Sequence, residues 1–176
     1  EVFVCSTGKI GVPLPMDRIS QGVNDCVKAL SADGSHDAAE AIMTTDTVAK
    51  EMAIELDLEG GPVRIGAIAK GSGMICPNMA TMICIITTDA EMEPFALQGV
   101  LSKAAQGSFN RICVDNDTST NDSVLCLANG RSGIAPLVPG TEEYNRFADA
   151  LAHACTVLAE ALVRDGEGAT KFVTIE

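Results

Sequence analysis

The sequence predicts an α/β fold in which helices are layered on a mixed or antiparallel sheet. Apolar and polar side chains alternate over residues 52–59, and Gly60-Gly61 leads into a return strand over 63–68, which is typical of a β-hairpin. The apolar run over residues 80–87 fits a buried strand, and apolar residues at helical spacing predict a long amphipathic helix over 142–164. A hairpin beside separate amphipathic helices favours this arrangement over a doubly wound parallel sheet.

The N-terminal part of the chain is predicted to pass from a strand to two helices. Residues 2–5 are apolar and predict a strand, which Ser6-Thr7-Gly8 turns into a loop that prolines keep extended. Apolar residues at helical spacing predict a helix over 16–30. The Ala-rich stretch over 36–43 predicts a second, shorter helix.

The rest of the chain supplies the other elements of the sheet and its helices. Pro94 suits the first turn of a helix that runs to about Gln106. Thr141 is predicted to cap the long helix, because acidic residues follow it at the positive end of the helix dipole. The remaining predicted elements are a Gly-rich loop over 70–78, short strands over 111–114 and 124–128, a polar loop over 115–122, and a last strand that ends at Ile175.

Composition and charge exclude several classes of partner. The formal net charge is −12, from 12 basic and 24 acidic residues, and the basic residues form no stripe. The chain therefore lacks the positive surface by which proteins bind nucleic acid or an anionic membrane. No apolar run approaches the length of a membrane span. A chain of 176 residues is long enough for one domain with a sizeable core.

The cysteine and histidine content indicates a reducing compartment and no metal site. The 7 cysteines form no C-x-x-C pair, and an odd number without tight spacing argues against a disulfide framework. With only 2 histidines, the chain has few ligands for zinc. Six cysteines lie in apolar segments and are predicted to be small core residues. They are Cys5, Cys26, Cys84, Cys113, Cys126 and Cys155.

Thr81 stands at the entrance of the predicted buried strand, where its surroundings indicate a reactive hydroxyl. Composition alone makes it an ordinary strand threonine, because β-branched residues favour strands. However, Gly71 and Gly73 allow the backbone to approach a ligand closely, and Ala80 leaves its own carbonyl uncrowded. A threonine hydroxyl is a weak nucleophile without an adjacent base. If the Ala80–Thr81 bond is cut, the new α-amine, with a reference pKa of about 7.7–8.0, supplies that base.

Five ordered segments together identify a family. The first contains Thr81 and reads K-G-S-G-M-I-C-P-N-M-A-T-M. The others are S-T-G-K-I-G-V-P-L-P-M at 6–16, A-I-M-T-T-D-T at 41–47, D-N-D-T-S-T-N-D at 115–122 and D-G-E-G-A-T-K at 165–171. Over nearly its whole length, the chain resembles the ornithine acetyltransferase family, the glutamate N-acetyltransferases of arginine biosynthesis. The set of motifs is far more specific than any one of them.

The resemblance implies a self-processing enzyme with an N-terminal-nucleophile-like fold. In the family, the precursor is cut between the positions of Ala80 and Thr81. Residues 1–80 would then end an α chain and residues 81–176 would begin a β chain, so that the chain is a single-domain fragment spanning both. Thr81 heads the β chain and forms an acetyl-enzyme ester.

The resemblance also implies roles for five other residues. Thr7 and Gly8 match the pair that stabilises the oxyanion, a role that suits a hydroxyl and a backbone N–H. Thr44, Lys70 and Glu167 match positions that bind substrate, together with Thr81. Lys70 suits the α-carboxylate of an amino acid, and Glu167 suits an amine. Because Thr45 neighbours Thr44, a shift of one residue in the alignment exchanges these two.

The implied reaction is a ping-pong transfer of an acetyl group from N-acetylornithine to glutamate through an acetyl-Thr81 ester. It uses no metal and no organic cofactor. Some members of the family also accept acetyl-CoA as acetyl donor, and the sequence does not decide between the two modes. The family further implies that the α and β chains of one precursor assemble as a heterotetramer in the cytoplasm.

The polar loop over residues 115–122 raises the question of calcium. It lacks the glycine and the distal glutamate of an EF-hand, so a network of hydrogen bonds near the site or an interface is predicted instead. No metal ligand is assigned.

Two alternative functions are consistent with parts of this pattern. One is a self-processing aminopeptidase of related fold, although the usual nucleophile of such enzymes is serine. The other is a truncated, non-catalytic fragment that acts as a structural or binding module. The chain begins at Glu1 inside an apolar run, which predicts that an N-terminal portion has been lost. By resemblance it also stops before the C-terminal region that completes the substrate site of the family.

Overall fold

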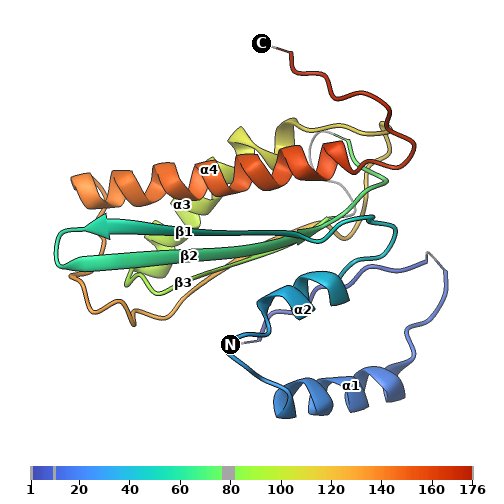
Figure 1. The fold of residues 1–176 in the computed structure, drawn as a ribbon, viewed down its shortest axis with the longest axis horizontal. Helices are drawn as coiled ribbons and strands as arrows, with labels where there is room; N and C mark the ends of the chain where they lie inside the picture. The colour runs from blue at the N-terminus through green and yellow to red at the C-terminus, as the bar shows by residue number, and fades with distance from the viewer. Residues whose placement is uncertain (1, 10, 77–81, 176) are drawn as a thin grey trace.

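A four-stranded mixed sheet forms the centre of the protein. The structure is a computed structural model that describes residues 2–9, 11–76 and 82–175. Its strands are β1 (Lys50–Leu58), β2 (Gly61–Lys70), β3 (Ile83–Thr88) and β4 (Ser123–Ala128), in that order across the sheet (Figure 1). β1 with β2 and β2 with β3 are antiparallel, whereas β3 and β4 are parallel. The predicted mixed sheet layered with helices is therefore confirmed.

Helices cover the two faces of the sheet unequally. They are α1 (Met16–Lys28), α2 (Ser35–Ala41), α3 (Pro94–Gly107), the 3-10 helix η1 (Phe109–Arg111) and α4 (Glu142–Arg164), and the four predicted helices are confirmed. α4 packs on α3, β1 and β2, whereas α2 contacts β1 and β2 from the other side (Figure 1). α1 lies apart from the sheet, and none of its residues is buried.

The turn between β1 and β2 depends on two glycines. Leu58 pairs with Gly61 at the end of the hairpin, and φ is +96° at Gly60 and +140° at Gly61. Residues with a Cβ rarely adopt such angles. The turn thereby fixes the register in which Leu56 lies opposite Val63, on the face of the sheet that packs into the core.

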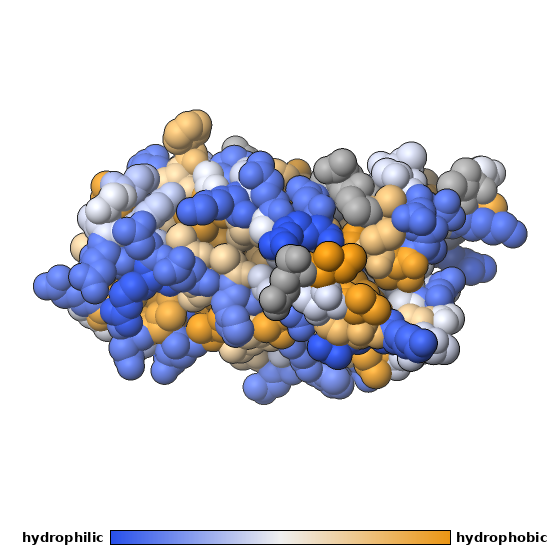
Figure 2. Space-filling model, turned by 90° about the horizontal axis from the view of Figure 1, so that it is seen from above, coloured by the Kyte–Doolittle hydropathy of each residue, from blue (hydrophilic) through white to orange (hydrophobic). Residues whose placement is uncertain are grey.

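The core lies between this face of the sheet and the helices α3 and α4. α4 contributes a stripe of side chains at helical spacing, each at most 1% exposed: Phe147, Leu151, Cys155, Leu158 and Leu162. Seen from the side of α4, the surface is mostly hydrophilic (Figure 2), as expected for a helix whose apolar stripe is turned inward. Among the described residues, no helix is both long enough and apolar enough to cross a membrane.

Replacing Thr141 with alanine is expected to lower the free energy of unfolding by about 1 kcal/mol. Thr141 is the N-cap of α4, and its hydroxyl oxygen accepts a hydrogen bond from the backbone N–H of Tyr144 at 3.2 Å. Its loss leaves one donor of the first turn without this partner. Urea unfolding curves measure the difference, and Thr141→Ser, which keeps the hydroxyl, is the control. An alanine variant as stable as the wild type would contradict the assignment.

Three predicted strands are not formed. Residues 2–5 and 169–175 form no strand within the described part of the chain, and most of their apolar side chains are exposed: Val2, Phe3, Val4, Val173 and Ile175. At 111–114, Arg111 ends η1, and the N–H of Val114 donates to the carbonyl oxygen of Ile75 at 2.6 Å rather than to a strand. Apolar, β-prone sequence makes a strand only where a neighbouring strand can pair with its backbone.

The prediction that six cysteines are core residues is correct for only part of the set. Cys84 and Cys155 are fully buried, Cys5 and Cys126 are half-buried, and Cys26 and Cys113 are exposed. Cys26 is exposed because α1 packs on no other described element. An amphipathic pattern identifies the apolar side of a helix but does not supply the surface that covers it.

Candidate functional site

Three residues that the resemblance links to substrate line one pocket of about 200 Å³. Thr44 lies in the loop after α2, Lys70 is the last residue of β2, and Glu167 lies in the loop after α4. Segments far apart in the sequence thus meet where β2 leaves the sheet. The remaining lining residues are Thr45, Ser72, Gly73 and Met74.

Lys70 brings a buried amine to this pocket. The residue is 1% exposed, and its Nζ donates a hydrogen bond to the hydroxyl of Thr44 at 3.2 Å. Burial lowers the pKa of Lys70, and the charge of Lys50 acts in the same direction. The carboxylates of Asp46 and Asp122 act against both effects and favour the protonated form of Lys70.

The geometry distinguishes Thr44 from Thr45. Thr44 accepts the hydrogen bond from Lys70, whereas the hydroxyl of Thr45 is hydrogen-bonded to the hydroxyl of Ser72 at 2.6 Å. Both line the pocket, but only the first of these hydroxyls contacts the lysine among the described residues. This contact favours Thr44 as the partner of Lys70 at the site.

Glu167 is held beside the Gly-rich loop by its backbone. Its N–H donates to the carbonyl oxygen of Ser72 at 2.6 Å. The carboxylate lies against Gly73, so that a Cβ added there would come within 3.0 Å of the carboxyl carbon of Glu167. A glycine at position 73 therefore allows the acidic group to sit in the pocket wall, and the pocket presents an amine and a carboxylate together.

A buried ion network lies behind the pocket, and it was not predicted from the sequence. Lys50 Nζ is 2.7 Å from Asp46 Oδ1 and 2.6 Å from Asp165 Oδ2. Burial alone would raise the pKa of both carboxyl groups. Hydrogen bonds, including those from Lys50, outweigh this effect and hold both pKa values below the ordinary value. The spacing of Asp46 and Lys50, four residues apart, was the only local sign of a pair.

The predicted oxyanion residues line a neighbouring pocket. Thr7 is half-buried and Gly8 is exposed, and both border a hollow of about 330 Å³. Asn121 anchors this segment, because its side-chain amide donates to the carbonyl oxygen of Ser6 at 3.3 Å. Met74 borders this pocket and the pocket of Lys70, so the two lie side by side.

Ala80 and Thr81 lie outside the described residues, but the chain on both sides is fixed by the polar loop. Asp115 accepts hydrogen bonds from the backbone N–H groups of Met74 and Ile75, at 2.6 and 2.9 Å. Asp122 accepts one from the N–H of Met82 at 2.8 Å. Within the described ranges, no group of three acidic, histidine or cysteine side chains is arranged to hold a metal ion.

Asp122 is an unusual member of this loop. Burial raises its pKa to about 6, although the N–H of Met82 and the charge of Lys70 act in the opposite direction. Its Oδ2 is buried and has no hydrogen-bond partner among the described residues. The ionised form is therefore less well stabilised than an ordinary aspartate in water.

Asp122→Asn is expected to stabilise the protein more at pH 8 than at pH 5. A carboxyl whose pKa is raised in the folded state stabilises that state at low pH and loses this contribution as the pH rises through about 6. The amide of asparagine does not ionise, so the variant does not lose stability in this way as the pH rises. Its carbonyl oxygen can still accept the hydrogen bond from the N–H of Met82. The advantage of the variant should grow by about 1 kcal/mol between the two pH values, measured by urea unfolding. Asp117→Asn, in an exposed part of the same loop, is the control, and an advantage independent of pH would contradict the assignment.

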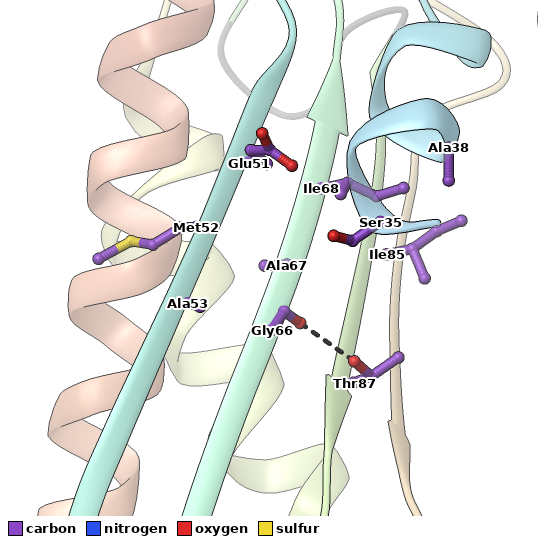
Figure 3. Close-up of a pocket in the computed structure, with 10 residues that line it drawn as sticks. All are labelled: Ser35, Ala38, Glu51, Met52, Ala53, Gly66, Ala67, Ile68, Ile85 and Thr87. Carbon is purple, nitrogen blue, oxygen red and sulfur yellow. Dashed lines mark hydrogen bonds between the residues drawn. The ribbon is translucent and has the colours of Figure 1, made fainter. Parts of the chain in front are cut away.

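A larger and more apolar hollow lies on the other face of the sheet, beneath α2. Figure 3 shows small and apolar side chains there, among them Ala38, Ala67 and Ile85. The hydroxyl of Thr87 donates to the carbonyl oxygen of Gly66 at 3.4 Å. Glu51 is the only ionisable residue among those that line this hollow, so the hollow carries no acid–base pair of its own.

Comparison with known proteins gives consistent results along the chain. The model of the ArgJ family matches residues 1–176. The Arginine biosynthesis bifunctional protein ArgJ of Symbiobacterium thermophilum is 56% identical over 172 residues, which are 98% of this chain and 43% of that protein. The Glutamate N-acetyltransferase of Methanocaldococcus jannaschii is 48% identical over 178 residues, 99% of this chain and 43% of that protein.

Among solved structures, a crystal structure of the Arginine biosynthesis bifunctional protein ArgJ from Bacillus halodurans matches with a TM-score of 0.48 and 47% sequence identity. The match covers 49% of this chain and 41% of that one. The chain thus spans about 43% of the length of the two curated relatives named above.

Proposed function

The chain belongs to the ArgJ family, and from this premise we propose that the longer protein containing it transfers an acetyl group from N-acetylornithine to glutamate. The names of the relatives support acetyl transfer within arginine biosynthesis, and one of them is a glutamate N-acetyltransferase. We further propose that the enzyme needs neither metal nor organic cofactor, and that it works in the cytoplasm.

The pocket of Thr44, Lys70 and Glu167 is the observation that carries this proposal. Substrates with both a carboxylate and an amine need a site that offers both charges. Lys70 faces the α-carboxylate and Glu167 faces the free amine of N-acetylornithine. Asp46 supports this role, because its negative charge favours protonated Lys70 in spite of burial.

Thr81 is the proposed nucleophile. Its hydroxyl attacks the acetyl carbonyl while its own α-amine takes the hydroxyl proton. The Thr7 hydroxyl and the Gly8 N–H donate to the oxyanion of the tetrahedral intermediate. The intermediate collapses by breaking the amide C–N bond, ornithine leaves with the proton, and the acetyl group remains as an ester on Thr81.

The second half of the reaction runs through the same groups. The amine of glutamate attacks the ester carbonyl and gives a proton to the α-amine of Thr81. The α-amine passes this proton to Oγ of Thr81 as the ester C–O bond breaks, and N-acetylglutamate is released. Free Thr81 is regenerated. Acetyl-CoA, as an alternative acetyl donor, would load the same hydroxyl and release the thiol.

The α-amine of Thr81 arises by self-cleavage in this proposal. The hydroxyl of Thr81 attacks the carbonyl of Ala80, the peptide bond becomes an ester, and water hydrolyses it. The products are a carboxyl group at residue 80 and a free amine at residue 81. The two chains stay together, and two such pairs form a heterotetramer.

Intact-mass analysis of the full-length protein, combined with an acetyl-transfer assay, tests the proposal. We expect two chains, cut between Ala80 and Thr81. We also expect acetyl transfer from N-acetylornithine to glutamate. Activity on amino-acid amides instead would indicate the self-processing aminopeptidase. A single uncut chain in a fully active preparation would refute the mechanism.

A further inference from the structure

The ion network behind the pocket is almost completely enclosed. The side chain of Lys50 is 1% exposed, that of Asp46 is 0% exposed, and that of Asp165 is 6% exposed. Lys50 therefore has two carboxylates in direct contact, together with the carbonyl oxygen of Val48 at 3.2 Å. Buried groups of this kind are strongly oriented, because each hydrogen bond is formed in a low-dielectric environment.

Asp46 connects the network to both members of the Lys70–Thr44 pair. Its Oδ1 accepts a hydrogen bond from the N–H of Gly71, the residue after Lys70, at 2.7 Å. Its Oδ2 accepts one from the N–H of Thr44 at 3.2 Å. One carboxylate therefore fixes the backbone from which each partner of the pair extends.

Asp165 connects the same network to Glu167, which lies two residues further along the chain. Asp165 Oδ2 accepts from the N–H of Thr47 at 2.9 Å, and the hydroxyl of Thr47 also donates to this carboxylate. The end of α4 is thereby tied to the loop that carries Thr44. Together with those of Asp46, these contacts join the segments that carry Lys70, Thr44 and Glu167.

We propose that Asp46, Lys50 and Asp165 are positioning residues, which set the separation between the Lys70 amine and the Glu167 carboxylate and so determine how well the pocket holds the two charged ends of the substrate. The inference rests on the proposed function and deepens it. None of the three side chains lines the pocket, so they act on substrate through Lys70, Thr44 and Glu167.

The charges of the network also act on Lys70. Within the network, the negative charge of Asp46 favours protonated Lys70, whereas the positive charge of Lys50 opposes it. The charged groups that act on the Lys70 amine are Asp46, Asp122 and Lys50. Loss of the Asp46 charge should therefore weaken the hold on a substrate carboxylate most strongly at alkaline pH.

Steady-state kinetics of full-length variants test the inference. Asp46→Asn keeps the shape of the side chain but removes its charge, and it should raise KM for N-acetylornithine at least tenfold while kcat changes less than threefold. A weaker hold on both the bound substrate and the transition state gives this pattern. The increase in KM should be larger at pH 9 than at pH 7. Glu55→Gln is the control: it removes a carboxylate of β1 that pairs with Arg64 of β2 at the surface, and it should leave both constants unchanged.

A second variant allows the test to be made if Asp46→Asn does not fold. The triple variant Asp46→Asn, Lys50→Met, Asp165→Asn carries no uncompensated buried charge and should raise KM in the same way. A folded variant of either kind with the KM of the wild type would overturn the inference. Failure of both variants to fold would also overturn it, since the network would then serve stability alone. Wild-type protein without acetyl transfer would refute the proposed function as well, whereas active wild type with unaffected variants would refute only the inference.

Discussion

Full-length protein with Thr81 replaced by alanine is expected to remain a single uncut chain without measurable acetyl transfer. In the proposed mechanism the hydroxyl of Thr81 carries out two separate attacks, one on the carbonyl of Ala80 and one on the acetyl donor. Removal of a catalytic nucleophile lowers activity by at least about 10³-fold. The other hydroxyls of the pocket, on Thr44, Thr45 and Ser72, are not next to a chain-terminal α-amine that could activate them as nucleophiles.

Two controls separate loss of the nucleophile from loss of structure. Thr81→Ser keeps a hydroxyl at the same position and should still be cut, with reduced transfer. Thr87→Ala removes a hydroxyl from strand β3, where its hydrogen bond among the described residues is to the carbonyl oxygen of Gly66, and it should leave cleavage and activity unchanged. An alanine variant at 81 that is both cut and active would remove the basis of the proposed function.

Local signals predicted most of the fold. The β1–β2 hairpin was predictable because its turn residues and its alternation lie within one continuous segment. The parallel pairing of β3 with β4 could not be predicted, because α3 and a long polar loop separate the two strands. The sequence of neither strand identifies its pairing partner. The wrongly predicted strands at 2–5 and 169–175 fail for the same reason, since strand propensity does not provide a neighbour.

The candidate site was predictable only through the family motifs. Composition and spacing give no reason to bring Thr44, Lys70 and Glu167 together, yet they line one pocket. The ion network behind it was missed because Lys50 and Asp165 are 115 residues apart, and because Lys50 precedes the strand predicted over 52–59. Lys50 instead occupies a position of β1 that faces inward, in register with Ala69.

Lys50→Met is expected to lower the free energy of unfolding by about 3–5 kcal/mol at neutral pH. The variant removes the only cation in contact with Asp46 and Asp165 among the described residues. Both carboxylates then remain buried with fewer partners, and this penalty exceeds the Coulombic stabilisation of an intact pair. Lys28→Met, in an exposed pair with Asp25 on α1, should leave stability unchanged within error, since water already solvates both groups.

The difference in free energy of unfolding between the wild type and Lys50→Met should become smaller as the pH falls. In the wild type, Lys50 helps to hold the pKa values of Asp46 and Asp165 below 3.8, so their contribution to stability is present above that pH and is lost as the pH falls through the folded-state values. Without Lys50, burial raises the pKa values of both carboxyl groups. As the pH falls, the variant therefore protonates them earlier than the wild type does, and protonation removes the buried charge. Urea unfolding at pH 7 and pH 4.5 should therefore show the larger gap at pH 7. An equal gap at both would mean that Lys50 acts through the packing of its methylene groups rather than through its charge.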